Sequence, residues 1–136
     1  MEARLQRYRQ KINFILEKLN DLPKQPKNTI EIDATLYRLQ VAIEAMIDIA
    51  AMLVKDKGYT VSDDYHNLQQ LADIKVIPSA LAEELKRLNS MRNAIVHKYN
   101  TFEAETVIKN KENSRKVIVK FLRNTEHELK TIFKPA

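Results

Sequence analysis

Apolar residues recur at intervals of three and four over long stretches of the chain, the spacing that places side chains on one face of a helix. A first stretch, over residues 2–20, carries Leu5, Tyr8, Ile12, Ile15 and Leu19. A second follows a proline-containing break and carries Leu36, Leu39, Ile43, Met46, Ile47, Ala50, Leu53 and Val54. Asn28 with Glu31 three residues later is typical of a helix start, and Gly58 supplies a left-handed stop. The pattern predicts two helices, the second about 43 Å long.

The second half of the chain predicts three further helices. A short connecting helix begins at Ser62 or Asp63, both favourable N-caps, and is interrupted at Ile77-Pro78. Pro78 suits the first turn of a fourth helix. The apolar stripe of this fourth helix is Leu81, Leu85 and Leu88. A fifth helix spans roughly residues 105–133, with Val107, Ile108, Ile118, Phe121, Leu122, Leu129 and Ile132.

These elements predict the fold class. Long helices joined by short loops favour an antiparallel bundle. The chain of 136 residues has a single glycine, four prolines and 44% hydrophobic residues, a composition that favours helices over a turn-rich β fold. We therefore expect an all-α protein, an antiparallel four- to five-helix bundle, with residues 1–136 forming a single domain.

Composition also limits the functional classes. The absence of cysteine excludes disulfides and thiolate metal sites. No apolar run approaches the roughly 20 residues of a membrane span, and the first residues lack the layout of a signal peptide. We therefore expect a cytoplasmic protein with no membrane partner. The formal net charge of +5 is compatible with a polyanionic partner such as RNA.

The predicted fourth helix departs from its own pattern. Continuing its stripe in steps of four and three leads to Arg92, Ile95 and Tyr99. Two positions where leucine is expected are therefore polar. Because arginine is almost never fully buried unless it is paired, Arg92 indicates a polar cleft, a buried ion pair or a subunit interface.

Polar side chains that could take part in a reaction lie close to Arg92 in the sequence. At about 100° per residue, Asn93 and His97 lie near 100° and 140° from Arg92, and Tyr99 lies near −20° if the helix continues that far. An imidazole can take a proton from a 2′-hydroxyl, and a guanidinium can stabilise the phosphate without a metal. Such cleavage leaves a 2′,3′-cyclic phosphate. The alternative from spacing alone is that the arginine and histidine cap carbonyls or pair locally.

Acidic and basic residues elsewhere are further candidates. Glu44 and Asp48 lie four residues apart, and either could orient Arg92 through an ion pair across the bundle; the alternative is a solvated acidic face. A basic run could follow an RNA backbone or form a plain solvated face. It comprises Lys109, Lys111, Arg115, Lys116, Lys120 and Arg123. His66 and His127 are isolated and lack metal-ligand spacing, so we expect no metal site.

Residues 92–99, Arg-Asn-Ala-Ile-Val-His-Lys-Tyr, resemble the R-x-x-x-x-H-x-Y signature of the HepT-like toxins. These toxins are a branch of the HEPN (higher eukaryotes and prokaryotes nucleotide-binding) superfamily. Residues 39–50 and the Val-Ile-Pro at 76–78 add to the similarity, which covers roughly residues 2–133. A bare R-x-x-x-x-H is common, whereas the eight-residue form with these segments is more specific.

The resemblance implies a bundle that forms a two-fold homodimer, with two Arg-His motifs facing one RNA-cutting cleft. It implies that Arg92 stabilises the phosphate, that His97 is the general acid and base, and that Asn93 orients the pair. Lys98 would be an additional phosphate contact.

The resemblance also implies a partner. This would be an MntA-like nucleotidyltransferase antitoxin that attaches AMP to Tyr99 and so blocks the site. ATP would be used only by that antitoxin, and this chain would need no cofactor.

Three hypotheses follow. The leading one is a metal-independent endoribonuclease toxin of a type II/VII-like HEPN–nucleotidyltransferase pair. The second is a non-catalytic dimeric HEPN subunit that binds nucleotide or RNA and partners a nucleotidyltransferase. The third, a basic DNA-binding protein, lacks helix-turn-helix spacing.

Overall fold

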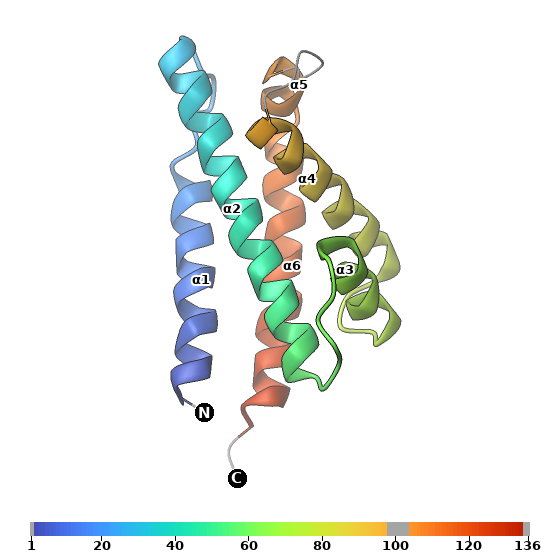
Figure 1. Cartoon of the computed structure of the whole chain (residues 1–136). Helices are drawn as coiled ribbons and strands as arrows, with labels where there is room; N and C mark the ends of the chain where they lie inside the picture. The colour runs from blue at the N-terminus through green and yellow to red at the C-terminus, as the bar shows by residue number, and fades with distance from the viewer. Residues whose placement is uncertain (1, 98–103, 135–136) are drawn as a thin grey trace.

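The computed structural model describes residues 2–97 and 104–134 of the chain. These residues form six helices (Figure 1). They are α1 (Glu2–Asn20), α2 (Thr29–Asp56), α3 (Asp64–Asp73), α4 (Ser79–His97), α5 (Ala104–Lys109) and α6 (Lys111–Ile132). The all-α class predicted from the hydrophobic pattern is confirmed.

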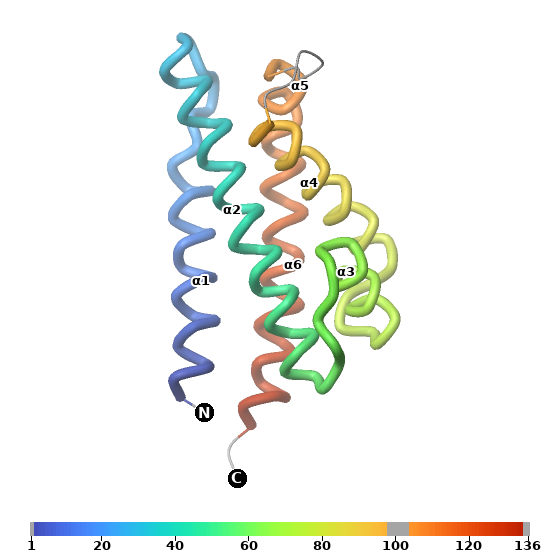
Figure 2. The backbone as a smooth tube through the Cα atoms, viewed as in Figure 1, coloured from blue at the N-terminus to red at the C-terminus, as the bar shows by residue number. Residues whose placement is uncertain are grey.

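The four long helices form the bundle, and consecutive ones run in opposite directions. Figure 1 shows α1 and α2 side by side and antiparallel, with α6 behind α2 and α4 tilted across the bundle. Short α3 packs on both α2 and α4. The backbone trace in Figure 2 shows that the last turn of α4 and short α5 lie at the end of the bundle opposite the start of α1.

Helix α2 is the centre of the core, because it packs against each of the other five described helices. Every position of its predicted apolar stripe is buried. Five further residues of α2 are buried as well: Thr35, Ala42, Ala45, Ile49 and Met52. Burying a Val, Leu, Ile or Met side chain contributes roughly 1.5–3 kcal/mol, so α2 provides the largest share of the hydrophobic stabilisation among the described helices.

The ends of α2 form as the sequence predicts. The side chain of Asn28 accepts a hydrogen bond from the backbone N–H of Glu31 at 2.9 Å, and Glu31 accepts one from the backbone N–H of Lys27 at 3.0 Å. At the other end Gly58 has φ of 90°, and the N–H of Tyr59 reaches the carbonyl of Val54 at 3.0 Å. This is the left-handed termination that glycine favours.

The third helix ends earlier than predicted. It stops at Asp73 rather than continuing to Ile77-Pro78. Lys75 adopts φ of 63° without being glycine, and the N–H of Val76 donates to the carbonyl of Leu71 at 2.8 Å. The same type of left-handed stop therefore ends α3, and Pro78 lies directly before α4.

The predicted fifth helix is wrong in one respect, because it is broken into α5 and α6 at Asn110. The Asn110 side chain donates to the carbonyl of Thr106 at 2.9 Å, and its own carbonyl accepts from the Ser114 hydroxyl at 3.1 Å. Asparagine side chains compete with the backbone ladder in this way. The apolar period runs on across the break, since Val107 and Val117 are both buried.

A polar cluster joins the start of α1 to the end of α2. The Tyr8 hydroxyl donates to Asp56 Oδ2 at 2.6 Å, and Arg4 Nε donates to the same oxygen at 2.9 Å. Asp56 ends α2, where the helix dipole disfavours a carboxylate, so these two donors compensate its charge. Burial of the phenol, and then its bond to Asp56, raise the pKa of Tyr8 well above its ordinary value.

Within the described ranges, no helix is both long and apolar enough to cross a membrane.

Tyr8 makes stability sensitive to alkaline pH. Below about pH 10 the phenol is neutral in both states. Above that value it ionises first in the unfolded chain, so the free energy of unfolding falls by up to about 1.4 kcal/mol per pH unit. We expect Tyr8→Phe to cost about 1 kcal/mol at pH 7 and to lessen this alkaline loss.

Urea unfolding from pH 8 to 11 measures the effect. Tyr37→Phe, which alters a side chain on an exposed residue, is the matched control and should keep the wild-type slope. An equal alkaline loss in Tyr8→Phe and wild type would contradict the expectation.

Candidate functional site

The buried stripe of α4 is interrupted at Arg92, as the sequence predicts. Leu81, Leu85, Leu88 and Ile95 are all buried. Arg92 occupies the step between Leu88 and Ile95, and its side chain is 21% exposed. The arginine therefore lies at the margin of the core, where it is partly withdrawn from water.

Arg92 is held by two neighbours. Its Nη2 lies 3.5 Å from Asp64 Oδ2, at the start of α3, and 3.4 Å from Asn89 Oδ1, one turn earlier on α4. The Asn89 side chain in turn donates to Asp64 Oδ2 at 3.4 Å. The Nε–H of Arg92 is buried and has no hydrogen-bond partner in the described part of the chain. An unsatisfied buried donor costs about 1–3 kcal/mol, so this atom favours an additional acceptor.

The partner acid of Arg92 is therefore Asp64, and the prediction that Glu44 or Asp48 pairs with it is wrong for this chain. Asp48 pairs with Lys11 of α1 at 3.2 Å, and Glu44 accepts from Gln40 at 3.2 Å. The reason is geometric. Glu44 bonds within α2 and Asp48 bonds to α1, whereas the first turn of α3 lies against α4.

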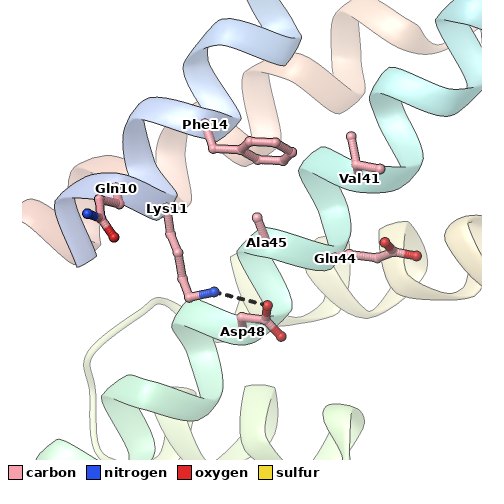
Figure 3. Close-up of a pocket in the computed structure, with 7 residues that line it drawn as sticks. All are labelled: Gln10, Lys11, Phe14, Val41, Glu44, Ala45 and Asp48. Atoms are coloured by element: carbon pink, nitrogen blue, oxygen red, sulfur yellow. Dashed lines mark hydrogen bonds and ion pairs between the residues drawn. The ribbon is translucent and has the colours of Figure 1, made fainter. Parts of the chain in front are cut away.

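Glu44 and Asp48 instead line a groove between α1 and α2, of about 400 Å³ (Figure 3). Phe14 lies over Val41 and Ala45 there, and the ion pair of Lys11 and Asp48 crosses one end of the groove. The groove is mostly apolar, and neither Arg92 nor His97 lines it.

The other motif residues follow Arg92 along α4. Asn93 is half-buried, and His97 lies on an exposed position in the last described turn. Five residues of helix place His97 about 140° around the axis from Arg92. Lys98 and Tyr99 lie outside the described residues. The structure thus places Arg92, Asn93 and His97 on one helix end.

Asp64 and Asn89 were missed by sequence reasoning. The first turn of α3 is well anchored, because Asp63 caps it by accepting from the backbone N–H of His66 at 2.9 Å. That bond, followed by one from the His66 ring, lowers the pKa of Asp63. The Tyr65 hydroxyl bonds to Ser90 Oγ of α4 at 2.7 Å. A run of Ser-Asp-Asp at 62–64 indicated a cap, but nothing local indicated that its last acid reaches α4.

The basic run does not form one continuous face. Lys109 and Lys116 are exposed, whereas Lys111 is 9% exposed. Arg115 is half-buried and donates to the carbonyl of Leu19, at the end of α1. Two of the six residues of the run, Lys111 and Arg115, are therefore held within the fold, and an RNA contact by the exposed residues stays a prediction.

A metal centre finds no support in the described ranges, where no three His, Cys, Asp or Glu side chains are arranged to hold an ion. The chemistry available from the described motif is that of a fixed cation, an amide and an imidazole. Such a set can bind a phosphate and transfer a proton.

Comparison with solved structures shows the same fold elsewhere. A crystal structure of the toxin–antitoxin pair MntA–HpeT, in a mutant form, aligns with a TM-score of 0.78 at 17% identity, covering 89% of this chain and 98% of that one. A tri-AMPylated HEPN toxin of Shewanella oneidensis, in complex with MNT antitoxin, aligns with a TM-score of 0.70 at 20% identity, covering 92% and 95%. At these identities the likeness concerns the fold.

Sequence comparison goes further. A protein of Archaeoglobus fulgidus named "Putative RNase" is 40% identical over 129 residues, which is 95% of this chain and 98% of the relative. The family model described as "Ribonuclease HepT-like" matches residues 5–125. Because the match spans most of the sequence and the relative aligns almost end to end, the chain belongs to the HepT-like ribonuclease family.

Proposed function

We propose that this protein is a metal-independent endoribonuclease in which Arg92 and His97 act on the scissile phosphate. The observation that carries the proposal is the setting of Arg92. It is a partly buried cation whose Nε–H has no hydrogen-bond partner among residues 2–97 and 104–134, and it lies five residues before an exposed histidine on the same helix. Family membership and the naming of the archaeal relative as an RNase support the same class of reaction.

The proposed reaction is an internal transfer. The His97 imidazole takes the proton of the 2′-hydroxyl, whose oxygen forms a bond to the neighbouring phosphorus. The bond from phosphorus to the 5′-oxygen breaks, and that oxygen takes a proton from a general acid, a role that the matching histidine of a second protomer would fill. The products are a 2′,3′-cyclic phosphate and a 5′-hydroxyl. Arg92 stabilises the negative charge that builds on the phosphate, and Asn93 orients the pair.

We infer that the working unit is a homodimer whose two motifs share one cleft. A dimer supplies both proton-transfer groups, one from each protomer. Exposed Lys109 and Lys116, together with Lys98, would contact the RNA backbone, where each cation gains affinity by releasing counterions.

We infer further that the protein is the toxin of a pair. Two solved structures that share its fold are named as a toxin–antitoxin pair and as an AMPylated toxin with its antitoxin. A cognate nucleotidyltransferase would use ATP to attach AMP to Tyr99. The added phosphate would compete with the substrate phosphate for Arg92, which gives a physical reason for inhibition.

Cleavage of RNA in the presence of EDTA tests the reaction. We expect His97→Ala to slow cleavage by about 10²–10⁴-fold and Arg92→Ala by about 10²–10³-fold. His127→Ala, at an exposed position of α6, is the matched control and should cleave like wild type. A substrate with 2′-deoxyribose at the scissile position should remain intact.

Absence of cleavage by the wild type, or equal cleavage by His97→Ala, would refute the proposed reaction. Wild-type protein that binds RNA without cutting it would indicate the non-catalytic subunit instead.

Incubation with ATP and the cognate nucleotidyltransferase tests neutralisation. Intact-mass and peptide mass spectrometry should find AMP on Tyr99, and Tyr99→Phe should remain unmodified and uninhibited. Tyr59→Phe, which alters a side chain on an exposed residue, should be modified like wild type. Full neutralisation of unmodified protein would show that the antitoxin acts by binding.

A further inference from the structure

We propose that Asp64 and Asn89 are positioning residues that hold the Arg92 guanidinium in its working orientation, and that α3 serves to deliver Asp64 to α4. The inference rests on the proposed function, because it assigns a role toward the same reaction. It concerns two residues outside the eight-residue motif, one of them on a different helix.

The three side chains form a closed triangle. Arg92 Nη2 contacts both Asp64 Oδ2, at 3.5 Å, and Asn89 Oδ1, at 3.4 Å. Asn89 Nδ2 closes the third side by donating to Asp64 Oδ2 at 3.4 Å. The amide of Asn89 thus accepts from the arginine with one atom and donates to the aspartate with the other. Both functions of the amide are used, and neither aspartate nor leucine could replace both.

Of the three side chains, Asn89 is the one held in place by burial. Asn89 is 1% exposed, so its side chain has no room to turn toward water. A buried amide without partners would cost about 1–3 kcal/mol, which is avoided only while Arg92 and Asp64 keep their places. Asn89 therefore favours one arrangement of its two neighbours.

The start of α3 is held on both sides of Asp64. Before it, the N–H of Ser62 donates to the Asn67 side chain at 2.8 Å, and the Asn67 amide returns a bond to the Ser62 carbonyl at 3.1 Å. After it, the backbone N–H of His66 donates to the capping side chain of Asp63 at 2.9 Å. Asp64 itself lies in the first turn, where the helix dipole favours a negative charge.

The effect of the triangle is geometric more than energetic. Asp64 is 40% exposed, and an ion pair this accessible is screened and contributes little to stability. Anchoring Nη2, however, fixes the plane of a flexible side chain, and with it the edge that meets a phosphate. Misplacement of a reacting group by about 1 Å can cost about 10²-fold in rate. Loss of Asp64 should therefore slow the chemical step while the fold persists.

Asp64→Asn, Asn89→Leu and Tyr65→Phe make a matched set. The first removes the charge with little change of shape, the second removes both amide functions, and the third breaks the adjacent α3–α4 bond without touching Arg92. We expect single-turnover RNA cleavage to fall about 10–100-fold in the first two and to stay within about twofold of wild type in the third. RNA affinity of Asp64→Asn should be equal or tighter, because a negative charge is removed.

A second measurement is independent of cleavage. The Nε–H of Arg92 is buried, so its proton should give a resolved arginine side-chain signal in nitrogen–proton NMR spectra. Arg92→Lys assigns the signal by its loss. The signal should shift or broaden in Asp64→Asn and Asn89→Leu and keep its position in Tyr65→Phe. Thermal unfolding of each variant checks that the comparison is made on folded protein.

The outcomes separate the two proposals. Wild-type cleavage by Asp64→Asn, or equal slowing by Asp64→Asn and Tyr65→Phe, overturns the positioning role. If wild-type protein does not cleave RNA, the proposed function fails, and an unchanged Arg92 signal in Asp64→Asn would then overturn the triangle as well. A signal that moves without any change in cleavage shows contact without positioning, and also overturns the inference.

Discussion

The burial of α2 on nearly every side is the constraint on which the rest of the structure depends. Each of the other described helices packs against it, so their positions are set relative to one hydrophobic rod. Helix α4 packs on this rod, and its Leu85 and Leu88 are buried. Helix α3 packs both on the rod and on α4. The geometry around Arg92 is therefore a consequence of how two helices dock on a third.

The sequence predicted those features whose causes are local. Asn28 with Glu31 starts α2 and Gly58 ends it because a side-chain cap and a positive φ act within a few residues. The left-handed stop at Lys75 was missed because a lysine carries no such signal. The break at Asn110 was missed because the spacing of apolar residues continues across it, and that spacing is the main signal from which a helix is predicted.

The candidate site divides in the same way. Arg92 was found because it interrupts a stripe, which is a local irregularity. Its partner was misassigned to α2, because the choice between Glu44, Asp48 and Asp64 depends on which helix start the fold brings to α4. The spacing of charged residues likewise did not predict that Lys111 is buried or that Arg115 contacts α1. Charge alone does not show which helix packs against α6.

The break at Asn110 has a consequence for local stability. Helix α5 has six residues, too few to be stable in water on its own, and Val107 is its buried contact with the core. Its opening should therefore cost far less than global unfolding, and its amide hydrogens should exchange as a unit separate from α6. The helix that follows the motif segment can thus open while the bundle beneath it stays folded.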